Sequence, residues 1–216
     1  MTENTLSNIL AHIKVRNMSE PQELSFWGET KMVKVIDKFF PEDVYNDIVN
    51  FIERTYQVHP ENNTISYHWV PGHSSTGYGV DKDSSWFWIL DATDFSFFTD
   101  ELLSLVNKRL NTDYIARAIY FNGMCPGQTA NFHTDSDSTI EYTLLLYVMP
   151  GYCFEWGGHT TFLAKDREDI SVVPSPNRAV IFPSRMYHKA FPFEDNRAPM
   201  RVTLAFKLGP QPDGNP

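Results

Sequence analysis

Apolar and polar residues follow a helical period in two segments of the first half of the chain. In the first segment, Val44, Ile48 and Ile52 recur four residues apart and the opposite face is charged. This pattern predicts an amphipathic helix that begins after Pro41. A second amphipathic helix is expected at residues 95–111. Each helix follows a segment that predicts a strand, at residues 31–40 and 85–91. The first half therefore predicts a mixed α and β support.

From Tyr114 onward the pattern changes to short apolar runs separated by Gly, Pro, Asn and Asp. The runs are 114–122, 143–149, 159–163, 170–174, 179–183 and 201–208. Strands of this spacing, without long helices between them, indicate an antiparallel sandwich or barrel. The predicted fold class is mainly β with supporting α-helices.

Length and composition predict one domain. The chain has 216 residues, of which 42% are hydrophobic, enough for one sizeable core and one active site. The domain is expected at residues 31–208, with its β core at about 114–208, between an N-terminal arm at 1–30 and a disordered tail at 209–216. Residues 58–84 mix Gly, Pro, Ser and Asn with aromatic residues, which suits either a lid over a site or a plain surface loop.

Charge and cysteine content exclude several classes of protein. The formal net charge is −9 and basic residues are scattered, which argues against a nucleic-acid partner. No apolar run reaches the roughly 18 to 20 residues of a membrane helix, and no secretory signal opens the chain. We therefore expect a soluble, cytoplasmic protein. Cys125 and Cys153 form no CxxC pair, so zinc-ribbon and thioredoxin-like sites have no support, and two packed thiols are favoured over a disulfide.

A candidate metal site combines His133, Asp135 and His188. In a strand, residues two apart project from the same face, so His133 and Asp135 would point together into whatever that face encloses. His188 follows the apolar run 179–183, from which a barrel strand could bring it alongside. Two imidazoles and one carboxylate, with open positions left on the metal, suit iron(II) in an oxygenase.

A candidate carboxylate-binding site opens the last apolar run. Alternation along a strand aims Arg201 and Thr203 at one face, and the guanidinium fork binds a carboxylate through two parallel hydrogen bonds. Arg197 is an alternative, because it lies four residues earlier. Arg201 is preferred because Pro199 separates Arg197 from the strand.

Several ordered motifs surround these residues: Gly127-Gln128 before the first histidine, a GGHTTF segment at 157–162, and an NRAVIFP segment at 177–183 before the second histidine. With the HxD pair and the late arginine, they resemble the prolyl 4-hydroxylase-like branch of the 2-oxoglutarate and iron(II) oxygenases. The resemblance covers roughly residues 33–208. It implies a double-stranded β-helix core of the jelly-roll or cupin-like kind, with N-terminal helices packed on it.

The resemblance also implies roles for individual residues. His133, Asp135 and His188 would ligate iron, and Arg201 would bind the distal carboxylate of 2-oxoglutarate. A further group would support that carboxylate or its surroundings: Tyr147, Tyr120 and Thr203. For both tyrosines, ordinary core packing stays an alternative. The implied reactants are Fe(II), 2-oxoglutarate and dioxygen, with ascorbate as a candidate reductant.

The function expected from this resemblance is hydroxylation of an unactivated C–H bond coupled to decarboxylation of 2-oxoglutarate, with a peptide, protein or small molecule as substrate. Peptidyl proline is the preferred substrate. Base demethylation has less support, because the last run, RVTLAFKL, lacks the second arginine of those oxygenases. A cupin-like binding module without turnover, or an interaction protein using the aromatic residues at 67–88, would be alternatives from other classes. His159 is expected to be an ordinary, exposed turn residue.

Overall fold

A computed structural model describes residues 22–26, 29–55, 69–72, 87–164 and 168–211. The sequence suits segment 58–84 to either a lid or a plain surface loop. Most of this segment lies outside the described residues, as do the ends 1–21 and 212–216. In the part of the chain that is described, no helix has the length and apolar character needed to cross a membrane. Cys125 and Cys153 are both free thiols, as expected.

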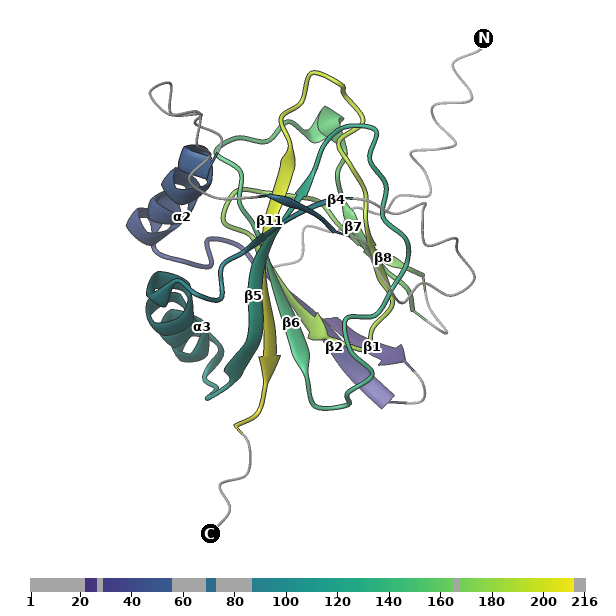
Figure 1. Cartoon of the computed structure of the whole chain (residues 1–216). Helices are drawn as coiled ribbons and strands as arrows, with labels where there is room; N and C mark the ends of the chain where they lie inside the picture. Colours follow the sequence, from purple (N-terminus) through teal and green to yellow (C-terminus); the bar gives the residue numbers. More distant parts are fainter. Residues whose placement is uncertain (1–21, 27–28, 56–68, 73–86, 165–167, 212–216) are drawn as a thin grey trace.

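Two antiparallel sheets form the core of the protein (Figure 1). In the larger sheet the strand order is β1 (Gln22–Phe26), β2 (Glu29–Ile36), β9 (Ala179–Pro183), β6 (Tyr142–Tyr147), β11 (Arg201–Gly209), β5 (Ile115–Met124), β4 (Phe87–Asp91) and β3 (Val70–Gly72). The smaller sheet has the order β10 (His188–Ala190), β7 (Thr160–Phe162) and β8 (Ile170–Val172). The prediction of a mainly β fold with a double-stranded β-helix core is confirmed.

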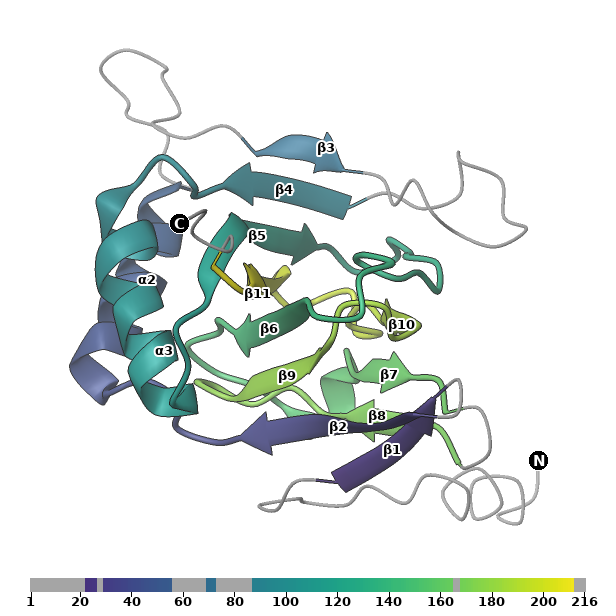
Figure 2. The same ribbon diagram turned by 90° about the horizontal axis from the view of Figure 1, so that it is seen from below.

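The helices pack together on one side of the larger sheet (Figure 2). They are α2 (Glu42–Thr55), the π-helical segment η1 (Phe97–Leu102) and α3 (Leu103–Leu110), and a 3-10 turn, η2 (Phe154–Trp156), lies in the β half. Ile48 and Ile52 of α2 belong to the same buried cluster as Phe98 and Leu102, and strand residues of the larger sheet complete this cluster. Both predicted helices are therefore present, although the second begins as a π-helix.

The central strand β11 divides its side chains between the two faces of the sheet. It is hydrogen-bonded to β5 on one side and β6 on the other. Leu204, Phe206 and Leu208 belong to the core cluster under the helices, whereas Ala205 belongs to the cluster between the two sheets. Because strand residues alternate between faces, the polar side chains two and four positions from Ala205 lie on the same inner face. They are Arg201, Thr203 and Lys207.

Three short strands were not predicted from the sequence: β1, β3 and β10. Strand β1 falls in the segment expected to be an arm and pairs with β2 at an edge of the sheet. Strand β3 lies at the opposite edge, and β10 has three residues. Such short edge strands need little apolar alternation, because they pair on one side only.

Asn177 connects the entry to α2 with the turn before β9. Its backbone is left-handed, with φ of 59°. Its carbonyl accepts a hydrogen bond from Phe39 N at 2.9 Å, its Oδ1 accepts one from Phe40 N at 3.0 Å, and its Nδ2 donates to Phe40 O at 2.8 Å. The Asn177 side chain therefore satisfies both backbone polar groups of a buried residue.

We expect Asn177→Ala to destabilise the metal-free protein by about 2 to 4 kcal/mol, because it leaves two buried backbone groups without partners in addition to the left-handed strain. Asn111→Ala is the matched control, since Asn111 is also left-handed, with φ of 56°, but is exposed and ends a helix. The control should cost about 1 kcal/mol. Urea unfolding of both variants measures the difference, and equal losses would show that the Asn177 side-chain bonds contribute nothing.

Candidate metal centre and cosubstrate pocket

A tight turn carries the chain from β5 toward His133. Residues Cys125 to Gln128 form the turn, in which Gln128 N donates to Cys125 O at 3.1 Å and Gln128 Oε1 accepts from Cys125 N at 2.7 Å. Pro126 precedes Gly127, whose φ of 81° is the left-handed conformation that the third position of a type II turn requires. The Gly-Gln pair noted in the sequence therefore redirects the chain from the sheet into the site.

The segment that carries His133 and Asp135 is not a regular strand, contrary to the sequence prediction. It is irregular except for an isolated antiparallel bridge between His133 and His188. In that bridge His133 N donates to His188 O at 3.0 Å and His188 N donates to His133 O at 2.9 Å. Asp135 N also donates to Ser184 O at 2.8 Å. The backbone of the segment 184–188, rather than strand alternation, thus fixes the positions of all three residues.

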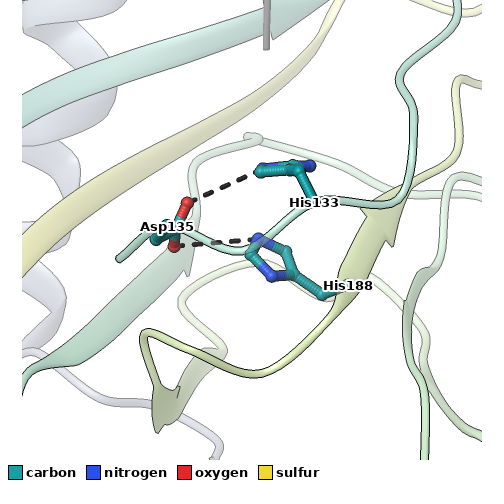
Figure 3. Close-up of side chains that lie close together, drawn as sticks. All are labelled: His133, Asp135 and His188. Carbon is teal, nitrogen blue, oxygen red and sulfur yellow. Dashed lines mark ion pairs between the residues drawn. The ribbon is translucent and has the colours of Figure 1, made fainter. Parts of the chain in front are cut away.

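The three side chains converge on one point (Figure 3). Asp135 Oδ1 lies 3.6 Å from His133 Nε2, and Asp135 Oδ2 lies 3.7 Å from His188 Nε2. One nitrogen or oxygen from each residue lies within 4.8 Å of the others. Residues 55 positions apart in the chain are therefore arranged as one candidate metal site.

The hydrogen bonds of both imidazoles leave Nε2 available as a metal ligand. His133 Nδ1 lies 2.9 Å from Asn131 O, and His188 Nδ1 lies 2.9 Å from Met186 O. A carbonyl oxygen can only accept, so Nδ1 carries the proton and Nε2 of a neutral ring keeps its lone pair. Burial lowers the pKa of His188 to about 4, so this ring is neutral at neutral pH.

Asp135 is held as a carboxylate by its surroundings. Thr143 Oγ1 donates to Asp135 Oδ2 at 2.6 Å, and Lys207 Nζ forms an ion pair with the same oxygen. Burial alone would raise the pKa of Asp135, but the Lys207 ammonium, followed by His188 and His133, holds it well below its usual range. Two imidazole nitrogens and one ionised carboxylate are the donor set that suits iron(II) with open positions. The residues present therefore fit the metal that the sequence predicts.

Arg201 is a buried cation without a described counterion. The residue is 2% exposed. Its Nε donates to Gly158 O at 2.7 Å and its Nη2 donates to Thr160 Oγ1 at 2.9 Å. No carboxylate of the described residues lies within ion-pair distance of it, although burial disfavours an unpaired charge and lowers the pKa of Arg201. Such a guanidinium fits an anionic ligand in the adjoining cavity.

The glycine pair of the GGHTTF segment allows this arrangement. Gly157 and Gly158 both have positive φ, of 72° and 78°. A Cβ at Gly158 would also meet Phe193 Cδ1 at 2.5 Å. Only glycine therefore fits at Gly158, whose carbonyl receives the Arg201 hydrogen bond.

Arg201 and the metal-site residues line one cavity between the two sheets, with a volume of about 270 Å³. Tyr120 and Thr203, for which the resemblance implies a supporting role, also line it. Tyr147 is not among the described lining residues. Its ring lies 5.3 Å from the guanidinium of Arg201, and its hydroxyl forms a hydrogen bond with Thr160 Oγ1 at 2.8 Å. Tyr147 thus packs behind the arginine.

Arg197, the alternative carboxylate anchor, and His159, expected to be an ordinary residue, both lie outside the metal cluster. The Arg197 side chain is 90% exposed and pairs with Asp195 at 2.8 Å, so the structure places it on the surface and Arg201 in the cavity. His159 is partly buried and stacks on Phe191 with 4.3 Å between ring centroids, so the expectation of an exposed turn residue was wrong. The aromatic ring of Phe191 covers it.

Sequence reasoning missed three polar residues of the site: Thr143, Thr160 and Lys207. Lys207 could have been found, because it lies in the same alternating register of β11 as Arg201 and Thr203. Thr143 and Thr160 could not, since threonine is common in strands and only the folded arrangement places these two beside Asp135 and Arg201.

Comparison with known proteins agrees with this geometry. Residues 118–206 match the model of a family described as the 2OG-Fe(II) oxygenase superfamily. That family implies Fe(II), 2-oxoglutarate and dioxygen as reactants. No curated protein matches the chain.

Solved structures share the fold. A prolyl-4-hydroxylase from Pseudomonas putida is similar, with 17% identity and a TM-score of 0.56 over 82% of this chain and 92% of that chain. A prolyl hydroxylase from Trichoplax adhaerens, solved with a peptide fragment of the hypoxia inducible factor oxygen degradation domain, has 16% identity and a TM-score of 0.57 over 82% of this chain and 83% of that chain. A 2OG-Fe(II) oxygenase family oxidoreductase from Burkholderia pseudomallei has 12% identity and a TM-score of 0.59 over 82% and 84% of the two chains.

At these identities the solved structures support the fold alone. The family match covers the segment that holds the candidate site. The metal-site residues and Arg201 all lie within residues 118–206. The resemblance predicted from the sequence is therefore confirmed: residues 118–206 match the model of the 2OG-Fe(II) oxygenase superfamily, and the fold is shared with solved prolyl hydroxylases and other oxygenases.

Proposed function

We propose that this protein is a dioxygenase that hydroxylates an unactivated C–H bond and couples this reaction to decarboxylation of 2-oxoglutarate to succinate and carbon dioxide. The observation that carries the proposal is the pairing, in one cavity, of the His133, Asp135 and His188 cluster with Arg201. A purely structural metal site has no use for a buried cation that lacks a described counterion.

Each part of the cavity has a task in this reaction. His133 and His188 present their Nε2 atoms, and Asp135 presents a carboxylate, so the three would hold Fe(II). Arg201 would bind the distal carboxylate of 2-oxoglutarate and orient it along the cavity, with Thr203 on the same strand face. When bound, iron and 2-oxoglutarate activate dioxygen, and the protein supplies orientation and exclusion of water.

For the substrate we propose a peptidyl proline. The support is the likeness of the fold to prolyl hydroxylases, one of which was solved with a peptide. Other structures of the same fold include an epimerase and a carbocyclase from nogalamycin biosynthesis, so a small molecule is the competing substrate class.

We expect His133→Ala to abolish metal binding and succinate formation, because it removes one of three metal ligands. The loss should exceed the about 10- to 100-fold that removal of an outer partner of a metal ligand costs. The measurement is anaerobic Mn(II) titration, followed by succinate formation from 2-oxoglutarate with Fe(II) in air. His159→Ala, which removes an imidazole that stacks on Phe191 outside the cluster, is the control. If both variants kept parental metal binding, the cluster would not be the metal site.

We expect Arg201→Ala to weaken 2-oxoglutarate binding by about 30-fold or more, since removal of one partner of a buried charge pair costs about 2 to 5 kcal/mol. The control is Arg197→Ala, which deletes an exposed guanidinium four residues away and should change nothing. Anaerobic calorimetry with Mn(II) present gives both dissociation constants. Weakened binding in Arg197→Ala alone would move the carboxylate site to the surface arginine and remove the basis of the proposal.

We expect proline-containing peptides to stimulate succinate formation and to gain one oxygen atom, detected by mass spectrometry. A parallel assay with free amino acids and other small molecules tests the competing class. Stimulation by small molecules alone would keep the oxygenase and reject the peptide. If 2-oxoglutarate and metal bind but no candidate is oxidised and no succinate forms, a binding module without turnover is favoured.

A further inference from the structure

Lys207 is a buried cation beside the metal site that the proposed reaction does not use. It lies near the end of β11, six positions after Arg201 and on the same face of the strand. Its Nζ forms an ion pair with Asp135 Oδ2, lies 3.4 Å from Thr143 Oγ1 and lies 5.5 Å from the centre of the Tyr120 ring. Burial alone would lower the pKa of Lys207, but the Asp135 carboxylate outweighs it and raises the pKa.

The ion pair distinguishes the two oxygens of Asp135. Oδ2 accepts from both Thr143 Oγ1 and Lys207 Nζ and lies 3.7 Å from His188 Nε2, whereas Oδ1 lies 3.6 Å from His133 Nε2. Two donors on one oxygen fix the carboxylate plane and occupy that oxygen. The arrangement therefore leaves Oδ1, beside His133 Nε2, as the carboxylate oxygen with fewer donors and more room for a metal ion.

The charge of Lys207 acts on the two bound reactants in opposite directions. A cation in contact with a metal-ligating carboxylate repels a divalent metal ion, and it attracts an anion bound nearby. The aspartate, lysine and arginine side chains that line the cavity are Asp135, Lys207 and Arg201, one anion and two cations. The cavity without metal thus already holds a positive excess suited to a dianionic ligand.

We propose that Lys207 is a positioning residue that holds Oδ2 of Asp135 and shifts the binding preference of the cavity from the metal ion toward the anionic cosubstrate. The inference rests on the proposed function, because it concerns the same metal and cosubstrate. It extends that function by proposing that Lys207 sets the affinity for the metal ion relative to the affinity for 2-oxoglutarate.

The test is the Lys207→Met variant, which keeps an unbranched apolar side chain of similar length but removes the charge. We expect anaerobic Mn(II) binding without 2-oxoglutarate to tighten by about tenfold, a factor that Coulomb's law gives for charges a few ångströms apart even in a water-like dielectric. Asp135 also loses its counterion, so a metal ion becomes its only partner of opposite charge. At saturating Mn(II), 2-oxoglutarate binding should weaken by about tenfold.

Shifts of opposite sign in the two dissociation constants separate this role from a structural one, because a damaged fold weakens the binding of both ligands. Lys108→Met is the matched control, since it removes the same charge from an exposed position on α3 and should shift neither constant. Lys207→Arg, which keeps the charge, should stay near the parent in metal affinity. Weaker binding of both ligands in Lys207→Met, or no change in either dissociation constant, would overturn the inference.

The same titrations keep the two proposals apart. A parent protein that binds Mn(II) but not 2-oxoglutarate would reject the oxygenase, while the metal titration of Lys207→Met would still decide the effect of the charge on the metal. A parent that binds neither would overturn both. A parent that binds both, with unchanged constants in Lys207→Met, would reject the role of Lys207 alone.

Discussion

Alternation along β11 is the constraint on which the site and the core both depend. The strand lies between β5 and β6, so its position is fixed by hydrogen bonds on both edges. Leu204 and Phe206 are fully buried under the helices, and this burial allows only one register. The same register turns Arg201 and Lys207 inward. A slip of one residue would expose the apolar set and remove both cations from the cavity, so packing of the core also specifies the electrostatics of the site.

The two inward cations of β11 are in different electrostatic situations. Lys207 is paired with Asp135, so its charge is compensated within the described protein. Arg201 is supported by neutral acceptors only, Gly158 O and Thr160 Oγ1. Burying a charge in this way is costly unless a partner arrives. Packing of Phe193 beside Gly158 places the Gly158 carbonyl within hydrogen-bond distance of the Arg201 guanidinium, and this bond offsets part of that cost. Arg201 is thereby preorganised for an anion, and the cost is recovered on binding.

The sequence predicted the fold class and combined His133, Asp135, His188 and Arg201 in one candidate site, but not how the chain brings these residues together. His133 and Asp135 were found by their spacing, and Arg201 by alternation with Thr203, because both patterns are local. The irregular path at His133 was missed, since it depends on hydrogen bonds to residues 184–188, far away in the chain. Lys207 was within reach of the alternation argument. Its pairing with Asp135 was not, because a strand pattern gives the face of a side chain and not its partner across the cavity.

Both histidine rings of the cluster are oriented by the same kind of local hydrogen bond. His133 Nδ1 bonds to the carbonyl of Asn131, and His188 Nδ1 bonds to that of Met186, in each case two residues earlier. The backbone bridge between His133 and His188 then joins these two local units. Ring orientation and tautomer are thus set by the chain path itself and need no contact with a metal. Since both rings are already oriented, a metal ion would have little side-chain entropy left to remove when it binds.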